Sequence, residues 1–230
     1  MMRLITSLVL AAMTMCPALA DDYVDLFEEA VAAINWDFED EWAFTETRLV
    51  DEVPWVARFD PRNSGNLRWT LVSVGGRAPS NDELAEFRDD KEDHDSSDGS
   101  QRVNIVGADT LQLTEETDDY WLFDFVPQED EIEFVDNVDA VVRIVKDGRY
   151  LESIDIRNNT ALKPGFGVKL STFSVQMRFG PAVDNGPIVP HAMQVKVAGR
   201  AFLFIGFDET ELISYSDFEF VDRNTNGTDQ

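Results

Sequence analysis

Cysteine is almost absent from this sequence of 230 residues. The one cysteine, Cys16, lies in the N-terminal segment, so the chain beyond it has no disulfide, no thiolate metal ligand and no thiol nucleophile. Histidine is also scarce. His94 and His191 do not have the H-E-x-x-H spacing or another paired spacing of metal sites. We therefore expect no metal centre and no cofactor.

Basic residues are few as well. The sequence has 45 acidic and 19 basic residues, and its formal net charge is −26. Nucleic acids and anionic membrane surfaces are bound by clustered lysine and arginine, so this balance argues against both partners. The acidic excess lies mainly between residues 21 and 147, with 35 acidic and 10 basic residues. We interpret it as adaptation to a salty habitat, with a basic or cation-rich partner as the alternative.

Recognisable catalytic motifs are missing. The sequence has no G-x-S-x-G nucleophile elbow, and neither the Walker nor the Rossmann glycine pattern occurs in it. Carboxylates are so numerous that the acid pair of a glycosidase cannot be selected among them. We therefore expect a protein that is not an enzyme, with a hydrolase as a minor alternative.

The N-terminal segment has the three zones of a secretory signal peptide. Arg3 precedes an apolar run over residues 4–15, and Pro17 then ends the run. Ala18 and Ala20 place small residues at the −3 and −1 positions of a cleavage site. We predict that residues 1–20 are removed after Ala20 and that the mature protein is periplasmic.

Two other interpretations of this segment are weaker. An apolar run of about 12 residues falls short of the ~20 that a transmembrane helix needs, and no later run would span a membrane. Lipid attachment at Cys16 is disfavoured by the bulky Met15 before it, because the lipoprotein signal has a small residue there. The signal peptide therefore also removes the only cysteine.

The apolar periodicity predicts two helices and many strands in one domain over residues 21–221. One helix is expected over Asp21–Trp36 and a second, inserted helix over residues 80–92, opened by the capping box of Ser80 and Glu83. An acidic loop over residues 89–100 and a flexible tail over residues 222–230 complete the prediction. The predicted strands begin at Trp42 and cover Pro54–Asp60, Leu67–Val72, Val103–Thr114, Tyr120–Pro127, Ala140–Lys146, Tyr150–Arg157, Val168–Phe179, Met193–Ala198, Ala201–Phe207 and Leu212–Val221.

Tight turns between these strands predict an antiparallel sheet. Asp147-Gly148 separates two alternating runs, which indicates a hairpin, and Gly199-Arg200 is interpreted as a second tight turn. Several strands alternate between a large apolar face and a polar one, as in Val168–Phe179. We expect an α+β fold: a curved antiparallel sheet, or half-open barrel, with helices covering its concave face.

A curved sheet that two modest helices fill only in part would leave an apolar pocket. Its lining is predicted to come from large side chains of the apolar faces, with a dry core as the alternative. The predicted cavity-lining residues are Trp42, Trp69, Phe123, Phe125, Met177 and Phe204. Gly75 and Gly76 lie between a strand and the inserted helix, and we interpret them as a hinge of the cover over this pocket.

Two C-terminal stretches carry a resemblance to a known family. These are GFGVKLSTFSVQMRF over residues 165–179 and AFLFIGFDETELISYSDFEFV over residues 201–221. With the N-terminal helix and the inserted helix, Trp42–Val221 resembles periplasmic proteins of the outer-membrane lipoprotein carrier fold (LolA/LolB-like). The resemblance implies a half-open antiparallel barrel closed by helices that holds acyl chains. The acidic charge and the loop over residues 89–100 depart from that family, so its substrate is not transferred.

Two functions follow, in order of preference. The first is a non-enzymatic periplasmic protein that binds a lipid, an acyl chain or a lipidated protein in an apolar cavity. The second is a structural or assembly factor of the envelope, which binds another protein and fills its sheet with its own helices. The oligomeric state is not predicted.

Overall fold

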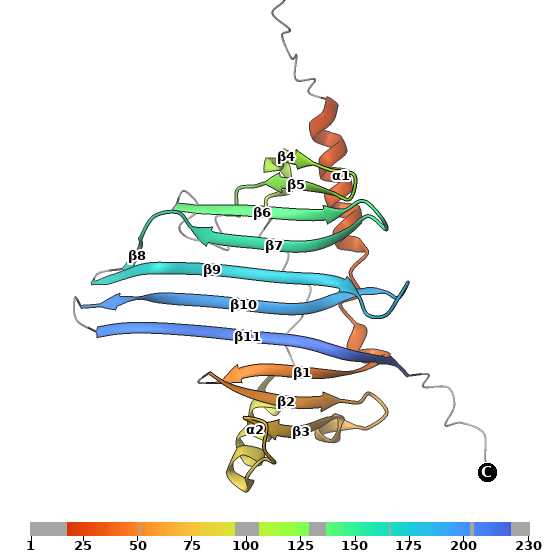
Figure 1. Cartoon of the computed structure of the whole chain (residues 1–230), viewed down its shortest axis with the longest axis vertical. Coiled ribbons are helices and arrows are strands. Elements are labelled where there is room, and N and C mark those ends of the chain that lie inside the picture. Colours follow the sequence, from red (N-terminus) through yellow and green to blue (C-terminus); the bar gives the residue numbers. More distant parts are fainter. Residues whose placement is uncertain are drawn as a thin grey trace, which may run out of the picture.

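The described part of the chain folds into an open antiparallel sheet with two α-helices (Figure 1). The computed structural model describes residues 18–50, 52–94, 106–128, 137–165, 167–202 and 205–221. Most of the predicted signal peptide, residues 95–100 of the predicted acidic loop and the whole predicted tail lie outside these ranges. The elements are α1 Ala18–Ala32, β1 Trp42–Val50, β2 Val53–Phe59, β3 Trp69–Val74, α2 Asn81–His94, β4 Gln112–Glu116, β5 Tyr120–Asp124, β6 Val138–Val145, β7 Tyr150–Asn158, β8 Leu162–Gly165, β9 Val168–Pro181, β10 Ile188–Ala201 and β11 Ile205–Phe220.

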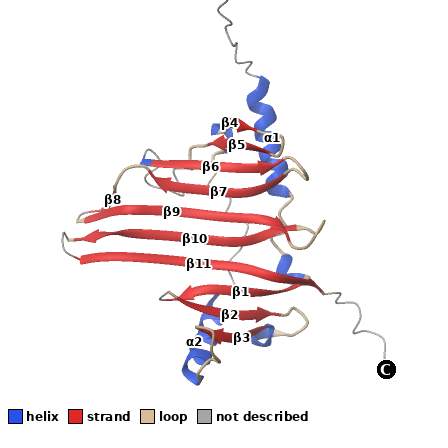
Figure 2. Ribbon diagram, in the orientation of Figure 1, coloured by secondary structure: helices blue, strands red, loops and turns tan. Residues whose placement is uncertain are grey.

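The strands form one sheet of eleven members (Figure 2). Their order is β3-β2-β1-β11-β10-β9-β7-β6-β5-β4, with β8 beside β9, and every pair is antiparallel. The last strand, β11, therefore lies between β10 and the first strand, β1. The predicted antiparallel sheet is confirmed. Closure toward a barrel is not, because β3 and β4 are two separate edges.

The turns decide how well the strand boundaries could be predicted. The hairpin at Asp147-Gly148 is confirmed: it joins β6 to β7, and Gly148 adopts a φ of +81°. The turn predicted at Gly199-Arg200 is wrong, because both residues lie inside β10 and pair with Phe207 and Gly206. Gly199 does not form a turn. It allows the backbones of β10 and β9 to lie close together, since a Cβ there would clash with the carbonyl oxygen of Lys169.

Other strand boundaries change in consequence. The chain turns at Phe202, and the two strands predicted over 201–207 and 212–221 are the single strand β11. β8 was not predicted. Of the strand predicted over Val103–Thr114, the described part contains the 3-10 helix Ala108–Thr110 and the beginning of β4.

Both helices differ from their predicted ranges. α1 begins at Ala18 and ends at Ala32, three to four residues before the prediction at both ends. α2 begins as predicted but continues to His94, so residues 89–94 are helical and do not belong to a loop. The physical reason is that this acidic stretch is tied to the sheet, where Asp90 pairs with Arg48 and Lys91 pairs with Glu46. No helix in the described ranges is long and apolar enough to span a membrane.

The two helices pack on the same face of the sheet. α1 buries Phe27 and Ala30 against β5, β6, β7 and β9, whereas α2 buries Phe87 against β2 and β3. Paired residues of antiparallel strands point to the same side, and the continuous register from β3 to β4 shows that both helices lie over one face. The opposite face carries cross-strand ion pairs, such as Arg178 with Asp155 at 2.8 Å.

Candidate functional site

One row of paired residues crosses the whole sheet beneath the two helices. Each member is the register partner of the next, so their side chains share the helix-covered face. From edge to edge the row reads Val74, Trp55, Arg48, Ile213, Met193, Met177, Ile154, Val142, Phe123 and Leu113. Nine of the ten are apolar, and Arg48 is the only charged one.

The part of this row beneath α1 is a packed core. Phe123, Val142 and Ile154 are fully buried in the largest core cluster, which also contains Phe27 and Ala30 of α1. Tyr23 of α1 packs edge-on against Phe123 with ring centroids 5.2 Å apart. This end of the row is therefore filled by the protein itself.

The middle of the row is less buried. Met193 is partly buried at the border of the core cluster beneath α1, and Ile213 is only half-buried. Ile213 belongs to none of the three core clusters or their packed neighbours. The described cores beneath α1 and α2 thus leave a half-buried apolar strip on β10 and β11, directly beside Arg48.

The end of the row beneath α2 is held by polar contacts. Lys91 donates to Glu46 at 2.8 Å, and the two side chains are only 11% and 7% exposed. The ammonium group of Lys91 also lies 3.8 Å from the ring centroid of Trp69, within the range of a cation–π interaction. Next to this pair, Arg48 donates to Asp90 at 2.8 Å. Two neighbouring residues of α2 thus pair with two residues of β1.

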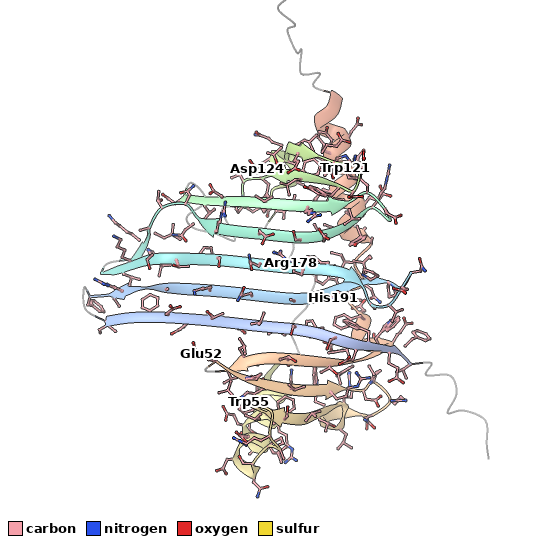
Figure 3. All side chains as sticks on the ribbon, viewed as in Figure 1. Glu52, Trp55, Trp121, Asp124, Arg178 and His191 are labelled. Atoms are coloured by element: carbon pink, nitrogen blue, oxygen red, sulfur yellow. The ribbon has the colours of Figure 1, made fainter. Side chains whose placement is uncertain are left out.

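A cavity of about 250 Å³ lies between α2 and strands β1 and β2. Arg48 lines it, and its buried Nε atom has no hydrogen-bond partner in the described part of the chain. A buried donor without a partner is costly, so an acceptor supplied by a ligand would relieve that cost. The cavity is lined by Glu46, Arg48, Val50, Trp55, Ala57, Glu86, Phe87 and Asp90, and Figure 3 shows Trp55 on β2 beside α2.

The five described residues of the predicted lining lie elsewhere. Trp42, Phe123, Phe125 and Met177 are at most 6% exposed and belong to two different core clusters. Trp69 is partly buried. It packs against the cluster that contains Trp42 and against the cluster that contains Phe87, and Lys91 lies over its ring. Phe204 lies outside the described residues. The structure therefore does not bring this set together around one cavity.

The residues that do form the site were missed, although the sequence contains a signal for them. Glu46 and Arg48 follow Phe44 at every second position, which places both charges on the buried face of β1. Charged residues in phase with a buried aromatic residue are unusual, because a buried charge needs a partner. That pattern could have indicated a polar site, whereas Asp90 and Lys91 could be found only from the packing of α2.

The predicted hinge residues form a tight turn before α2. Gly75 and Gly76 have φ values of +58° and +77°, which confirms that this connection needs positive φ. Arg77 then forms a two-pronged ion pair with Glu83, at 2.6 and 2.9 Å. A hinge motion of this turn stays a prediction.

The capping box at the start of α2 is confirmed. The Ser80 backbone N–H donates to Glu83 at 2.7 Å, and the Glu83 N–H donates to the Ser80 hydroxyl at 3.3 Å. The hydrogen bonds from Arg77 and then from the Ser80 backbone lower the pKa of Glu83 to about 2. The start of α2 is therefore fixed by ionic contacts at its surface.

A second, shallower cavity lies beside α1. It has a volume of about 280 Å³ and an acidic and aromatic lining: Asp22, Tyr23, Asp25, Leu26, Glu29, Trp121 and Arg149. Glu29 is already paired with Arg149 at 3.1 Å. Within the described ranges, no group of three or more histidine, cysteine, aspartate or glutamate side chains could hold a metal ion.

Comparison with protein-family models, with curated proteins and with solved structures finds no match to this chain.

Proposed function

We propose that this chain is a non-enzymatic envelope protein that binds an acyl chain carrying an anionic head group. The acyl chain would lie along the half-buried strip around Ile213 and Met193, and Arg48 would bind the head group. The observation that carries this proposal is the transverse row, which is apolar throughout except at Arg48. Its half-buried part, the apolar strip of Met193 and Ile213, ends at the cation of Arg48, which matches the chemistry of a fatty acid or an anionic lipid.

The contacts beneath α2 support the proposal that α2 is a cover which a ligand can displace. Of the residues that hold α2 on the sheet, Asp90 and Lys91 act through charge, and a ligand head group could replace Asp90 at Arg48. The unpartnered Arg48 Nε gives that head group an additional donor. In this proposal the helix-covered face is the concave one, and the predicted signal peptide brings the protein to the periplasm, where lipids must cross water.

A titration with a fluorescent fatty acid tests this function. Ile213→Ser should weaken binding about tenfold or more, because it removes an apolar contact with the acyl chain. Arg48→Gln should weaken binding by about the same factor, because it removes the cation that binds the head group. Leu212→Ser and Arg58→Gln are matched controls, because their side chains belong to the opposite face in the register of β11 and β2. Equal affinities for the site variants and their controls would overturn the proposal.

A second function is favoured by one specific observation. Trp42, Phe123, Phe125 and Met177 are buried among protein side chains, as expected for a sheet filled by its own helices. An envelope assembly factor that binds another protein would have such a core. In that case the purified protein would contain no lipid, and it would take up no fatty acid in the titration.

A further inference from the structure

Three strands extend beyond the rest of the sheet and form an arm. β9 and β10 each have 14 residues and β11 has 16, whereas the strands on either side are no longer than nine. The last pair of β1 with β11 is Arg48 with Ile213, and the last pair of β7 with β9 is Arg157 with Ser174. We define the arm as β8, β9 up to Phe173, β10 from Val197 onward and β11 up to Leu212.

The arm projects at one side of the molecule, away from α1 and α2 (Figure 1). Ile205 and Ile213 are eight positions apart in β11, which corresponds to about 26 Å at the usual rise of a strand. The end of the arm is therefore a separate surface, distinct from the site beneath α2.

Two large apolar side chains are exposed at the end of the arm. Phe202 is 56% exposed and Ile205 is 58% exposed, and the sequence from Ala201 to Phe207 contains no charged residue. Most exposed apolar residues need no explanation, but an apolar cluster at a projecting end indicates a contact surface.

The structure holds this exposed aromatic ring in a defined place. The N–H of Phe202 donates to the carbonyl of Gly167 at 2.7 Å, which joins the β10–β11 turn to the turn before β9. Phe202 has a φ of +49°, a conformation that is costly for an aromatic residue. A Cβ at Gly167 would lie only 3.0 Å from the Phe202 ring, so Gly167 allows the ring its position.

The described charges nearest to this end are basic, although the whole chain has a net charge of −26. The arm contains three bases, Lys163, Lys169 and Arg200, and its three acids follow further along β11, at Asp208, Glu209 and Glu211. Lys163, Lys169 and Arg200 of the arm are exposed, and none of them forms an ion pair with another described residue.

Two of these bases repel each other when no partner is bound. Lys169 lies directly opposite Arg200 in the register of β9 and β10, and like charges in that position destabilise a sheet. An anionic surface in contact with both would remove the repulsion. The first carboxylates on β11, Asp208 and Glu209, lie roughly 10–13 Å back from Ile205 along the strand.

We propose that the end of the arm docks on an anionic lipid bilayer. Phe202 and Ile205 would enter the interface between head groups and acyl chains, while Lys163, Lys169 and Arg200 would contact lipid phosphates. The net charge of the whole chain argued against such a partner. At physiological ionic strength, charges are screened over about 8 Å, so the distant acidic surface has little effect at the end of the arm. The local charge there therefore determines whether the arm binds an anionic bilayer.

Co-sedimentation with vesicles tests the docking surface. The protein should bind vesicles of phosphatidylethanolamine and phosphatidylglycerol but not vesicles of phosphatidylcholine alone, and added salt should weaken binding. The pair Phe202→Ser with Ile205→Ser should lower the affinity about tenfold or more. The pair Lys169→Gln with Arg200→Gln should lower it by about tenfold.

Matched controls keep the test specific. Leu67→Ser removes a side chain that is 73% exposed near the β3 edge, and Arg88→Gln removes an exposed base of α2; both should bind as the parent protein does. Circular dichroism of each variant confirms that the sheet is retained. The arm variants should also keep the parent affinity for the fluorescent fatty acid, so docking and acyl-chain binding can fail separately.

Three results would overturn the proposal. The first is no binding to anionic vesicles, and the second is equal binding to neutral vesicles. The third is binding that the arm variants leave unchanged. Sedimentation velocity adds a direct alternative: a dimer that the Phe202→Ser and Ile205→Ser pair dissociates, without vesicle binding, would assign the surface to a second copy of this chain.

Discussion

Lys91 of α2 lies 2.8 Å from Glu46 of β1, and both side chains are almost fully enclosed. A buried ion pair contributes little net stability compared with apolar residues of the same size, but removing one partner leaves an unpaired buried charge. The attachment of α2 therefore depends on keeping both members.

Lys91→Met should lower the free energy of unfolding by about 3–5 kcal/mol, measured by urea denaturation. It leaves Glu46 buried without its cation and also removes the cation above Trp69. The double variant Lys91→Met with Glu46→Leu should recover most of that loss. Arg149→Met, which breaks an exposed pair with Glu29, should cost less than about 1 kcal/mol. Equal losses for the two single variants would contradict this account of α2.

The aromatic cluster at the junction of β1 and β2 should dominate the stability of that half of the sheet. Phe44 is fully buried and stacks on Phe59 with ring centroids 4.9 Å apart. Phe44→Ala should therefore cost about 3–5 kcal/mol. The exposed Leu67→Ala should change stability by no more than about 0.5 kcal/mol. A loss for Phe44→Ala as small as that for Leu67→Ala, about 0.5 kcal/mol, would show that the cluster is not packed as described.

The turn between β3 and α2 should be sensitive to backbone strain. Gly76→Ala should lower stability by about 1–2 kcal/mol, because an alanine resists its left-handed conformation. Gly165→Ala is the matched control: a Cβ would meet nothing within 4 Å at either position, but only Gly76 has a positive φ. Thermal unfolding of the two variants makes the comparison. If Gly76→Ala also leaves fatty-acid uptake unchanged, the turn is not a hinge of the cover.

The ion pair at the start of α2 predicts a specific pH dependence. The pKa of Glu83 is lowered from 4.5 to about 2 in the folded protein by its bonds to Arg77 and Ser80. Its stabilising contribution is therefore complete above pH 4.5 and is lost as the pH falls toward 2.

Glu83→Gln should remove that part of the pH dependence. Urea denaturation at a series of pH values should show a shallower decline between pH 4.5 and 2 than in the parent protein. Asp89→Asn, at an exposed position of the same helix that does not line the cavity, should keep the parent profile. Parallel profiles for all three proteins would mean that the Arg77–Glu83 pair does not persist in solution.

Local patterns predicted the sheet better than they predicted the site. The alternation in Val168–Phe179 placed Val175 and Met177 on the buried face, and the Asp147-Gly148 turn was found because positive φ at a glycine is a local requirement. The turn predicted at Gly199 was wrong, because the sequence alone does not distinguish a glycine that lets a neighbouring strand lie close from a glycine that forms a turn.

The site depends on contacts between residues far apart in the chain. Arg48 and Asp90 are 42 residues apart, and Glu46 and Lys91 are 45 apart. No period or motif joins them, and the acidic composition made each carboxylate look like its neighbours. The five described residues of the predicted lining lie in or against packed cores for a related reason: large aromatic residues are the first to fill a core, so they mark burial more often than a cavity.

The most direct test of the central claim is the ligand content of the purified protein. Native mass spectrometry, followed by lipid extraction, should find one acyl-chain lipid or fatty acid for each chain, and Arg48→Gln should lose it while Arg58→Gln retains it. A protein that is empty in the native spectrum, yields no lipid on extraction and ignores fluorescent fatty acids would contradict the account.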